Sequence, residues 1–444
     1  MAMPTVQRSE TEKGPPPSSK FLIGVRRLGS AISRPVLAVI LAIIAGGIVI
    51  MITSSGSLGD RFSNAIGAYQ ALYSGSFGSL QSFAFTLVNV TPLIFAGISV
   101  AIAFRAGLFN IGAEGQLAVG AVAAYLVGFK APTMPGWVLV PLMVLASMLA
   151  GAVWGGIVGA LKAWRGAHEV VTTIMLNWIA FFVADYLITG PLKSPDLADA
   201  TAPVPVQTQL PQIAVLYNHT LGTFLPAIDS PTQYLVDISF ILALIALVVY
   251  WFIMKRTTFG YEVRVIGQNP QAARYAGIPV KKNIFAVMAI AGAFAGLAGS
   301  LRLMGQPPYQ LIGSTFRLDS VGFDAIGVAL LGHMTSIGIL FGALLFGGLR
   351  QGAGLMQLQA GIPGDLVFII QALVLFSIAA EFLPVIRRNM PRWLLFSRKP
   401  ALVGASGLTV VDLPQEENGK KDSVPPGESM GLDAGDSANS PKEG

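Results

Sequence analysis

The chain has 444 residues, of which 53% are hydrophobic and 12% are charged, and its formal net charge is +6 at pH 7. Soluble globular proteins carry about 25% charged residues, so this composition excludes an ordinary soluble domain and predicts an all-α, polytopic membrane protein. The sequence contains no cysteine, which excludes disulfides, thiolate catalysis and cysteine metal sites.

The N-terminal segment, residues 1–34, is polar and contains six basic residues, and we expect it to form a cytoplasmic tail. The first apolar run, PVLAVILAIIAGGIVIMI, begins at Pro35. It is longer than the roughly 7 to 15 apolar residues of a signal peptide, and no small-residue cleavage site follows it. This run is therefore predicted to remain in the protein as the first membrane span.

Apolar stretches long enough to span a bilayer, about 20 residues each, recur along the chain. They lie near residues 35–54, 83–104, 108–129, 137–161, 169–190, 234–254, 283–304 and 363–384. The stretch 318–352 is too long for one span and is interrupted at residues 332–336. We interpret it as two short spans, with a re-entrant segment as the alternative, which gives about ten spans in a transmembrane domain over 35–385.

Basic residues indicate the sidedness of the loops. They concentrate before residue 35, within 255–282 and from Arg387 onward, and such clusters favour the cytoplasmic side. Both termini are therefore expected in the cytoplasm, and the tail over 386–444, rich in Gly, Ser, Pro and charge, is expected to be largely disordered. The basic residues left on the external side are Arg61, Lys130, Lys193, Arg302, Arg317 and Arg350.

Two segments, 56–82 and 191–233, are expected on the external side, and the second is expected to be irregular surface. The second contains seven prolines, which disfavour regular helix. In this topology the second to fifth spans start outside and the seventh to tenth start inside, which is compatible with two inverted four-helix units.

Small residues at helical spacing predict close packing between two spans. Gly151, Gly155 and Gly159 recur at every fourth position, as do Gly292 and Gly296. Without a side chain, such positions allow two helix backbones to approach one another in a membrane.

The charged loop 255–282 contains a short helix signal, QNPQAARYAGIP. Asn269 is a favoured N-cap, Pro270 suits the first helical position, and Gly277 can supply a left-handed C-terminal cap. A helix of about two turns is marginal in water. We therefore expect a contact to hold it, although a solvated connector on the bilayer surface is the alternative.

The residues of this short helix suit contact with a partner. Ala272, Ala273 and Ala276 are expected to form a small-residue face that fits a groove. Arg274 and Tyr275 offer polar contacts beside it.

Polar residues within predicted spans are costly and mark candidate sites. Glu114 lies between Asn110 and Gln116 in a glycine-rich stretch, where an interrupted helix start can leave N–H groups free. It either lines a passage or serves as a buried cap that fixes the turn after Arg105.

A second pair of polar residues lies on the next span. Thr173 and Asn177 share one face at i and i+4. They either join helices by hydrogen bonds or line a route for a hydrogen-bonding solute.

Motifs for catalysis are lacking. No G-x-x-x-x-G-K-[ST] phosphate loop occurs, and HEVVT at His168 lacks the second histidine of the zinc metalloprotease helix. With three histidines and no cysteine, no catalytic residue, metal site or cofactor is expected within this chain.

Four stretches carry a family resemblance. EVRVIGQNPQAARYAGI resembles the cytoplasmic coupling segment of ATP-binding-cassette (ABC) import permeases, in the superfamily that includes branched-chain amino acid and ribose permeases. The other three resemble the nucleoside importer permeases, often described as simple-sugar permeases: FRAGLFNIGAEGQLAVGAVAAYLVG, GAHEVVTTIMLNWIA and IGVALLGHMTSIGILFGALLFGGLRQGAGLMQ. The similarity extends over about residues 80–385.

The resemblance implies the permease subunit of an ATP-driven importer in the bacterial cell membrane. A separate ATPase would contact the short helix through Asn269, Pro270, Ala272, Ala273, Arg274 and Gly277. A second related permease and an extracytoplasmic binding protein, docked on 191–233 and 56–82, would complete the complex. No nucleic-acid partner is expected.

The resemblance also implies that the solute is a nucleoside, and the candidate passage residues are Asn110, Glu114, Gln116, Thr173 and Asn177. Ribose or another simple sugar is the alternative solute. A self-contained ion-coupled carrier or channel is an alternative of a different class.

Overall fold

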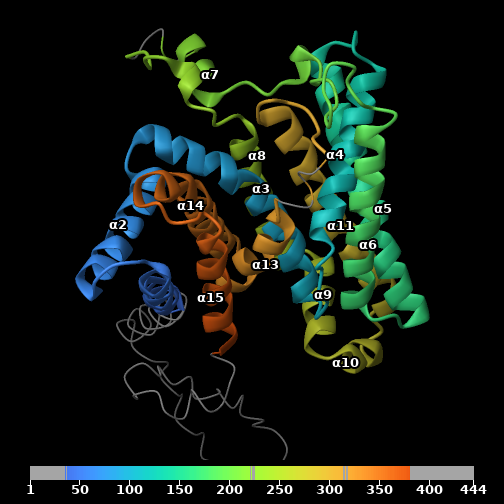
Figure 1. Ribbon diagram of the computed structural model, residues 1–444. Coiled ribbons are helices and arrows are strands. Elements are labelled where there is room, and N and C mark those ends of the chain that lie inside the picture. The colour runs from blue at the N-terminus through green and yellow to red at the C-terminus, as the bar shows by residue number, and fades with distance from the viewer. Residues whose placement is uncertain are drawn as a thin grey trace, which may run out of the picture. The chain divides into compact units, whose positions relative to one another are not determined.

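The computed structural model describes residues 36, 38–220, 222, 226–313, 316 and 319–380, which fold mainly as helices (Figure 1). Within these residues, six helices are long and apolar enough to cross a membrane: α3 (Leu80–Arg105), α5 (Gly136–Arg165), α6 (Glu169–Thr189), α8 (Ser239–Arg256), α11 (Val280–Gly305) and α14 (Ser336–Ala360). This confirms the predicted all-α polytopic fold class. The expected tails, 1–34 and 386–444, lie outside the described residues.

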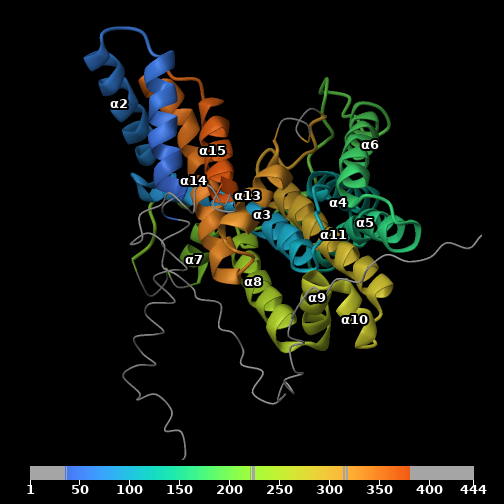
Figure 2. The same cartoon turned by 90° about the horizontal axis from the view of Figure 1, so that it is seen from below.

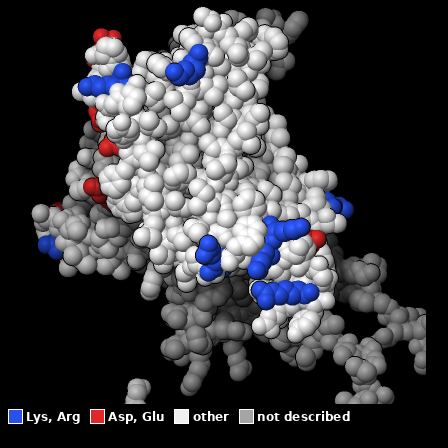
Figure 3. Space-filling view, turned by 90° about the vertical axis from the view of Figure 1, so that its right-hand side faces the viewer, with Lys and Arg blue, Asp and Glu red and all other residues white. Residues whose placement is uncertain are grey.

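Helices α5 and α6 present an apolar outer face. Their exposed side chains include Leu149, Val153, Met175, Phe182 and Tyr186. Figure 3 shows this side of the molecule, where the central band carries no charged residue and Lys and Arg gather near the lower end. An uncharged band between charged ends is the surface expected of helices that face lipid.

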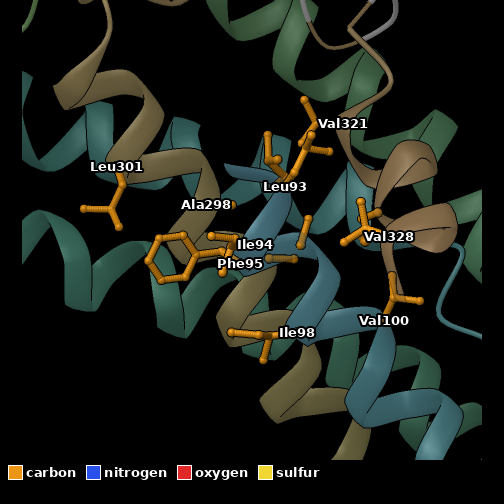
Figure 4. Close-up of a cluster of buried hydrophobic side chains, with 14 of the residues drawn as sticks. Leu93, Ile94, Phe95, Ile98, Val100, Ala298, Leu301, Val321 and Val328 are labelled. Carbon is orange, nitrogen blue, oxygen red and sulfur yellow. The ribbon is translucent and has the colours of Figure 1, made fainter. Parts of the chain in front are cut away.

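Helix α3 is the centre of the main hydrophobic core. It is buried along most of its length and contacts α8, α11, α13 (Val321–Leu331) and α14. Figure 4 shows Leu93 of α3 near Val321 of α13, and Phe95 of α3 directed toward Ala298 and Leu301 of α11. The core therefore joins helices that are more than 200 residues apart in the sequence.

Helices α5 and α11 meet through the glycines that the sequence singled out. A methyl group at Gly151 would overlap with the carbonyl oxygen of Gly292, and one at Gly296 would overlap with that of Ser147. The hydroxyl of Ser147 donates a hydrogen bond to the carbonyl oxygen of Gly296. The predicted close packing is thus confirmed, and α4 (Ala113–Lys130) adds Gly120 to the same contact.

A second hydrophobic cluster joins the helix over Ala38–Thr53 to α2 (Leu58–Phe77), α14 and α15 (Leu366–Ala380). Figures 1 and 2 both show α2, α14 and α15 together, on the side away from α4, α5 and α6. Segment 56–82, to which the sequence assigned no secondary structure, is largely helical. A capping box at Ser57 and Asp60 starts α2, and its small residues pack on α14 around Gly352.

The structure does not form the two short spans that were expected over 318–352. Helix α13 has 11 residues, about 16 Å at 1.5 Å per residue, which is about half of the hydrocarbon thickness of a bilayer. Helix α14 has 25 residues and is a full-length span. The first part, α13, is therefore a half-helix that is too short to cross the membrane. The second part, α14, is long enough to cross it.

The loops with opposite predicted sidedness lie at opposite ends. Segment 191–233 contains the short helices η1 (Val206–Thr208), α7 (Ile213–His219) and η3 (Pro231–Gln233). Figure 1 shows α7 at the top, whereas α9 (Thr258–Gln268) and α10 (Pro270–Tyr275) lie at the bottom. Which end is cytoplasmic, and whether the spans form two inverted units, remain predictions.

Candidate coupling surface and solute passage

Helix α10 has the caps that its sequence predicts. The side chain of Asn269 accepts hydrogen bonds from the backbone N–H groups of Gln271 and Ala272, and Pro270 occupies the first helical position. Gly277 follows the helix with a φ of 76°, in the left-handed region that favours glycine. The local sequence therefore determines where this short helix begins and ends.

The structure separates the three alanines that were expected on one face. Ala273 is fully buried and packs with Ile266 of α9 and Val280 of α11, so it cannot form part of an exposed contact surface. Ala272 and Ala276 remain exposed. The expected small-residue face is wrong for Ala273, because that side chain anchors α10 to its own chain.

The outward surface of α10 is formed by larger side chains. Tyr275 is 93% exposed, and Arg274 and Ala272 are exposed beside it. Figure 2, the view from below, shows α9 and α10 side by side at the ends of α8 and α11. An aromatic ring and a guanidinium group thus stand on a short helix at one end of the bundle, and such side chains are enriched in protein interfaces.

The candidate passage residues are all buried, with exposed fractions of 0–2%: Asn110, Glu114, Gln116, Thr173 and Asn177. Asn110 and Gln116 exchange two side-chain hydrogen bonds of 3.0 Å, and Asn110 also donates one to the hydroxyl of Ser99 on α3. These contacts join the start of α4 to α3. A passage-lining role for the two amides remains a prediction.

Thr173 and Asn177 connect α6 to the segment before α4. The amide of Asn177 accepts a hydrogen bond from the backbone N–H of Gly115 and donates one to the carbonyl oxygen of Ile111, both at 2.9 Å. The hydroxyl of Thr173 donates to the carbonyl oxygen of Glu169 on its own helix. The contacts of Asn177 have the form of the helix-joining alternative, whereas the hydrogen bonds of Thr173 stay within α6. The route for a solute remains a prediction.

Glu114 faces the start of the interrupted helix α13. Its Oε2 atom accepts a hydrogen bond from the backbone N–H of Gly322, and a methyl group at Gly322 would overlap with the backbone of Glu114. The N-terminus of a helix leaves N–H groups unpaired and carries a partial positive charge. A carboxylate at this place is therefore favourable, and Glu114 serves as a cap for α13 supplied by another helix.

A buried group of ion pairs lies beside Glu114, and sequence reasoning missed it. Arg302 of α11 and Arg350 of α14 both pair with Asp319, which precedes α13, and Arg350 also lies 3.5 Å from Asp324 of α13. We name these four residues the charged cluster. The sequence placed Arg302 and Arg350 on the external side without assigning them partners. Both lie within helices and face carboxylates, while the side of the membrane remains a prediction. The matching aspartates were the signal that could have found the cluster.

A cavity of about 140 Å³ borders this cluster. Its polar lining comes from Arg302, Gln306 and Gln310, and its apolar lining includes Leu303 and Phe316. Pockets for drug-sized ligands are about 300–1,000 Å³, so in this conformation the cavity does not hold a whole solute of that size. Among the described residues, no group of three or more His, Asp or Glu side chains could hold a metal ion.

Segment 191–233 is hydrogen-bonded to the loop that lines the cavity. The backbone N–H groups of Thr201 and Val204 donate hydrogen bonds to the carbonyl oxygens of Leu311 and Tyr309, at 3.0 and 2.8 Å. Tyr309 and Leu311 belong to the loop that lines the cavity. The segment at one end of the bundle and the cavity wall are thus joined by their backbones.

Comparisons with known proteins agree with this architecture. A family described as the permease component of the branched-chain amino acid transport system matches residues 82–379. The guanosine ABC transporter permease NupP of Bacillus subtilis is 38% identical over 359 residues, which cover 81% of this chain and 95% of that protein. The nucleoside ABC transporter permease NupB of Lactococcus lactis subsp. cremoris is 36% identical over 354 residues, 79% of this chain and 92% of that protein.

A relative that is named for a different solute is also similar. The glucose ABC transporter permease TsgB13 of Haloferax volcanii is 33% identical over 357 residues, which cover 79% of this chain and 88% of that protein. All three matches cover nearly the whole relative, so the similarity extends well beyond a single motif.

Proposed function

Because the chain belongs to the family of branched-chain amino acid transport permease components, we propose that it is the membrane-spanning subunit of an ATP-driven ABC importer for nucleosides. The relatives NupP and NupB, named for guanosine and nucleoside transport, support this solute class. The glucose permease of H. volcanii, at 33% identity, supports a simple sugar as the second candidate. The importer works in the cell membrane, with both termini of this chain in the cytoplasm.

The observation that carries the proposal is the exposed surface of α10. This helix is anchored through buried Ala273 and capped by Asn269, yet it leaves Tyr275 and Arg274 facing outward. A short helix that is fixed to its own chain and presents an aromatic ring suits a docking element for another subunit. We assign α10 to contact with the ATPase, whose closure on ATP displaces α9 and α10 relative to the spans.

The remaining subunits follow from the opposite end of the bundle. Segment 191–233 lies there and is bonded to the cavity wall at Tyr309 and Leu311, which suits it to receive a solute from an extracytoplasmic binding protein. A second related permease completes the passage. Helix α2, at 58–77, forms most of segment 56–82, the second surface proposed to receive the binding protein.

The polar groups around the cavity favour a neutral solute. Gln310 offers an amide donor and acceptor, whereas the amide of Gln306 donates to the carbonyl oxygen of Val88 and accepts from Arg302. Arg302 and Arg350 are both engaged by carboxylates of the charged cluster, so a phosphate or carboxylate would have to displace an aspartate. A nucleoside is neutral and rich in hydrogen-bonding groups, and the cavity must widen for it to pass.

Uptake by the reconstituted complex tests the solute and the energy source together. Vesicles that contain this chain, the ATPase, the second permease and the binding protein should accumulate radiolabelled guanosine only with ATP. Unlabelled ribose or glucose in excess should not compete. Competition by ribose or glucose would indicate a simple sugar, rather than a nucleoside, as the solute. Uptake by this chain alone, without an ATPase, would indicate a self-contained carrier or channel and overturn the proposal.

A docking experiment tests the role of α10. Ala272→Glu and Tyr275→Glu change exposed positions on α10, and Val206→Glu is the control, since Val206 is 78% exposed on segment 191–233. Both α10 variants should lose co-purification with the ATPase, while the control keeps it. Wild-type recovery of the ATPase with both α10 variants would contradict the assignment.

A further inference from the structure

The turn between α13 and α14 is a meeting point of three helices. The carbonyl oxygen of Met334 accepts hydrogen bonds from Nη2 and Nε of Arg105, at 2.8 and 3.3 Å, and from the hydroxyl of Tyr250, at 2.6 Å. Arg105 is the last residue of α3, and Tyr250 is a buried residue of α8. The carbonyl group of Met334, which follows the C-terminal end of α13, is therefore held by α3 and α8.

This turn has an unusual backbone. His333 and Met334 have φ values of 48° and 55°, in the left-handed region that non-glycine residues rarely adopt. Such conformations persist only where the surrounding contacts maintain them. The hydrogen bonds from Arg105 and Tyr250 are such contacts, so the position of the turn depends on those two side chains.

Arg105 is also one of the places where α9 contacts the spans. A methyl group at Gly267, at the end of α9, would overlap with the carbonyl oxygen of Arg105. The backbones of α9 and of the α3 terminus thus touch without an intervening side chain. A displacement of α9 toward α3 has to move Arg105 with it, because nothing compressible lies between them.

Helices α9 and α10 move as one unit. Asn269 ends α9, through its N–H bond to the carbonyl oxygen of Val265, and caps α10 with its side chain. Ile266 and Ala273 pack against each other across this one-residue link. Any force on α10 therefore reaches the end of α9 at Gly267.

From this geometry we propose that Arg105 and Tyr250 are positioning residues that transmit the displacement of α9 and α10 to the half-helix α13 through the carbonyl group of Met334. The inference rests on the proposed ATPase contact at α10. It assigns α13, whose upper end meets Glu114 and the charged cluster, as the element that the ATPase moves.

A second connection from α9 exists but acts on a stiffer element. The amide of Asn283 on α11 donates a hydrogen bond to Oε2 of Glu262 on α9, at 2.7 Å. Helix α11 is locked to α5 by glycine contacts over several turns, whereas α13 is only 11 residues long. Helix α13 packs in the core through Val321 and Val328, but it is the shorter helix, and two side-chain donors hold the turn at its C-terminal end. That end is the part expected to change position.

The test measures coupling rather than activity alone. In vesicles that contain the full complex, we would measure solute uptake and ATP hydrolysis together for Tyr250→Phe and Arg105→Met. The matched control is Tyr69→Phe, because the Tyr69 hydroxyl donates to the carbonyl oxygen of Ile43, also at 2.6 Å, far from α9 along the chain. The proposal predicts that uptake per ATP falls by roughly 2- to 30-fold in the first two variants and stays unchanged in the control.

Arg105→Lys provides a graded comparison. Lysine keeps the positive charge but lacks the guanidinium group, whose two nitrogens both donate to the carbonyl oxygen of Met334. Its uptake per ATP should lie between wild type and Arg105→Met. Equal ratios in all variants, or the same loss in Tyr69→Phe, would overturn the inference. Wild-type uptake of a solute other than guanosine would contradict only the proposed solute, because the ratio is measured with whatever solute the complex carries.

A second measurement needs no solute. The chain has no cysteine, so a spin label at Ile337→Cys, which is 71% exposed next to the turn, reports on this place alone. ATP should change the label's mobility in the otherwise wild-type complex and leave it unchanged with Tyr250→Phe. A change of the same size in both would overturn the inference even if uptake is absent.

Discussion

Helix α11 makes two contacts of opposite character. Toward α5 it presents Gly292 and Gly296, and the two backbones touch. Toward α13 and α14 it presents Arg302, which pairs with Asp319 in the charged cluster. One side of the helix is thus fixed by shape and the other by charge.

This difference indicates which helices move together. Backbones in direct contact cannot slide without overlap, because no side chain can adopt another rotamer to make room. Ion pairs can exchange partners, and Asp319 already shares its carboxylate between Arg302 and Arg350. We therefore expect α4, α5 and α11 to behave as one body, to which the start of α13 is fixed where Gly322 touches the backbone of Glu114. The C-terminal end of α13 is the part expected to shift against it.

The largest effect is expected from breaking the charged contact. Arg350→Met leaves Asp324 without its arginine and weakens the pairing of Asp319. We expect a loss of about 3 kcal/mol in the free energy of unfolding, at the lower end of the range for an isolated buried charge, because the Arg350 side chain keeps 21% exposure. Unfolding of the purified chain in detergent, followed by tryptophan fluorescence, measures this loss.

A second substitution shows whether the uncompensated charge is the cause. Asp324→Asn in the Arg350→Met background removes the unpaired carboxylate while Arg302 and Asp319 stay paired. The double variant should recover part of the lost stability. If it is as unstable as Arg350→Met alone, then volume rather than charge explains the loss.

The next effect concerns the contact that is fixed by shape. Gly292→Leu places a side chain where the backbone of α5 lies, and we expect a loss of about 2 kcal/mol, as for other overpacked interiors. Gly354→Leu on α14 is the control, because the space around Gly354 is open. The same unfolding measurement applies to both variants. Equal stability of the two would show that α5 and α11 are farther apart than the structure has them.

Those two contacts also show what the sequence can predict. Gly151 and Gly292 were identifiable because spacing of small residues reports directly on helix packing. The charged cluster was missed because the rule for sidedness counts Lys and Arg without asking for partners, and Arg302 and Arg350 were assigned to the outside. Asp319 and Arg350 are 31 positions apart, so only the fold brings them together.

The two short elements differ in the same way. The boundaries of α10 followed from Asn269, Pro270 and Gly277, since caps are local chemistry. The burial of Ala273 did not follow from the local sequence, because it depends on packing against Ile266 of α9 and Val280 of α11. Helix α2 was missed since its composition is polar, although Ala65, Ala68 and Ala71 recur at helical spacing on its buried face.

A smaller effect is expected at the hydrogen-bonded start of α4. Asn177→Leu leaves the N–H of Gly115 and the carbonyl oxygen of Ile111 without partners, at a cost of about 1 kcal/mol. If Asn177 also lines the passage, solute uptake per assembled complex should fall several-fold, more than the amount of complex does. Thr172→Val is the control, since that hydroxyl contacts only its own helix. Uptake that falls only in step with the amount of complex would assign Asn177 to helix joining alone.

The smallest effect is expected at a Lys–Glu pair whose cation is somewhat more exposed than the arginines of the charged cluster. Lys162 and Glu169 join the ends of α5 and α6 at 2.7 Å, with the Lys162 side chain 30% exposed. Because water screens this pair and solvates the lysine, Lys162→Met should cost about 0.5 kcal/mol or less. Measured beside Arg350→Met, it separates the effect of burial from that of charge pairing. A loss at Lys162 as large as at Arg350 would mean that the charged cluster owes nothing to its position inside the bundle, and α13 would lose its distinction from the surface helices.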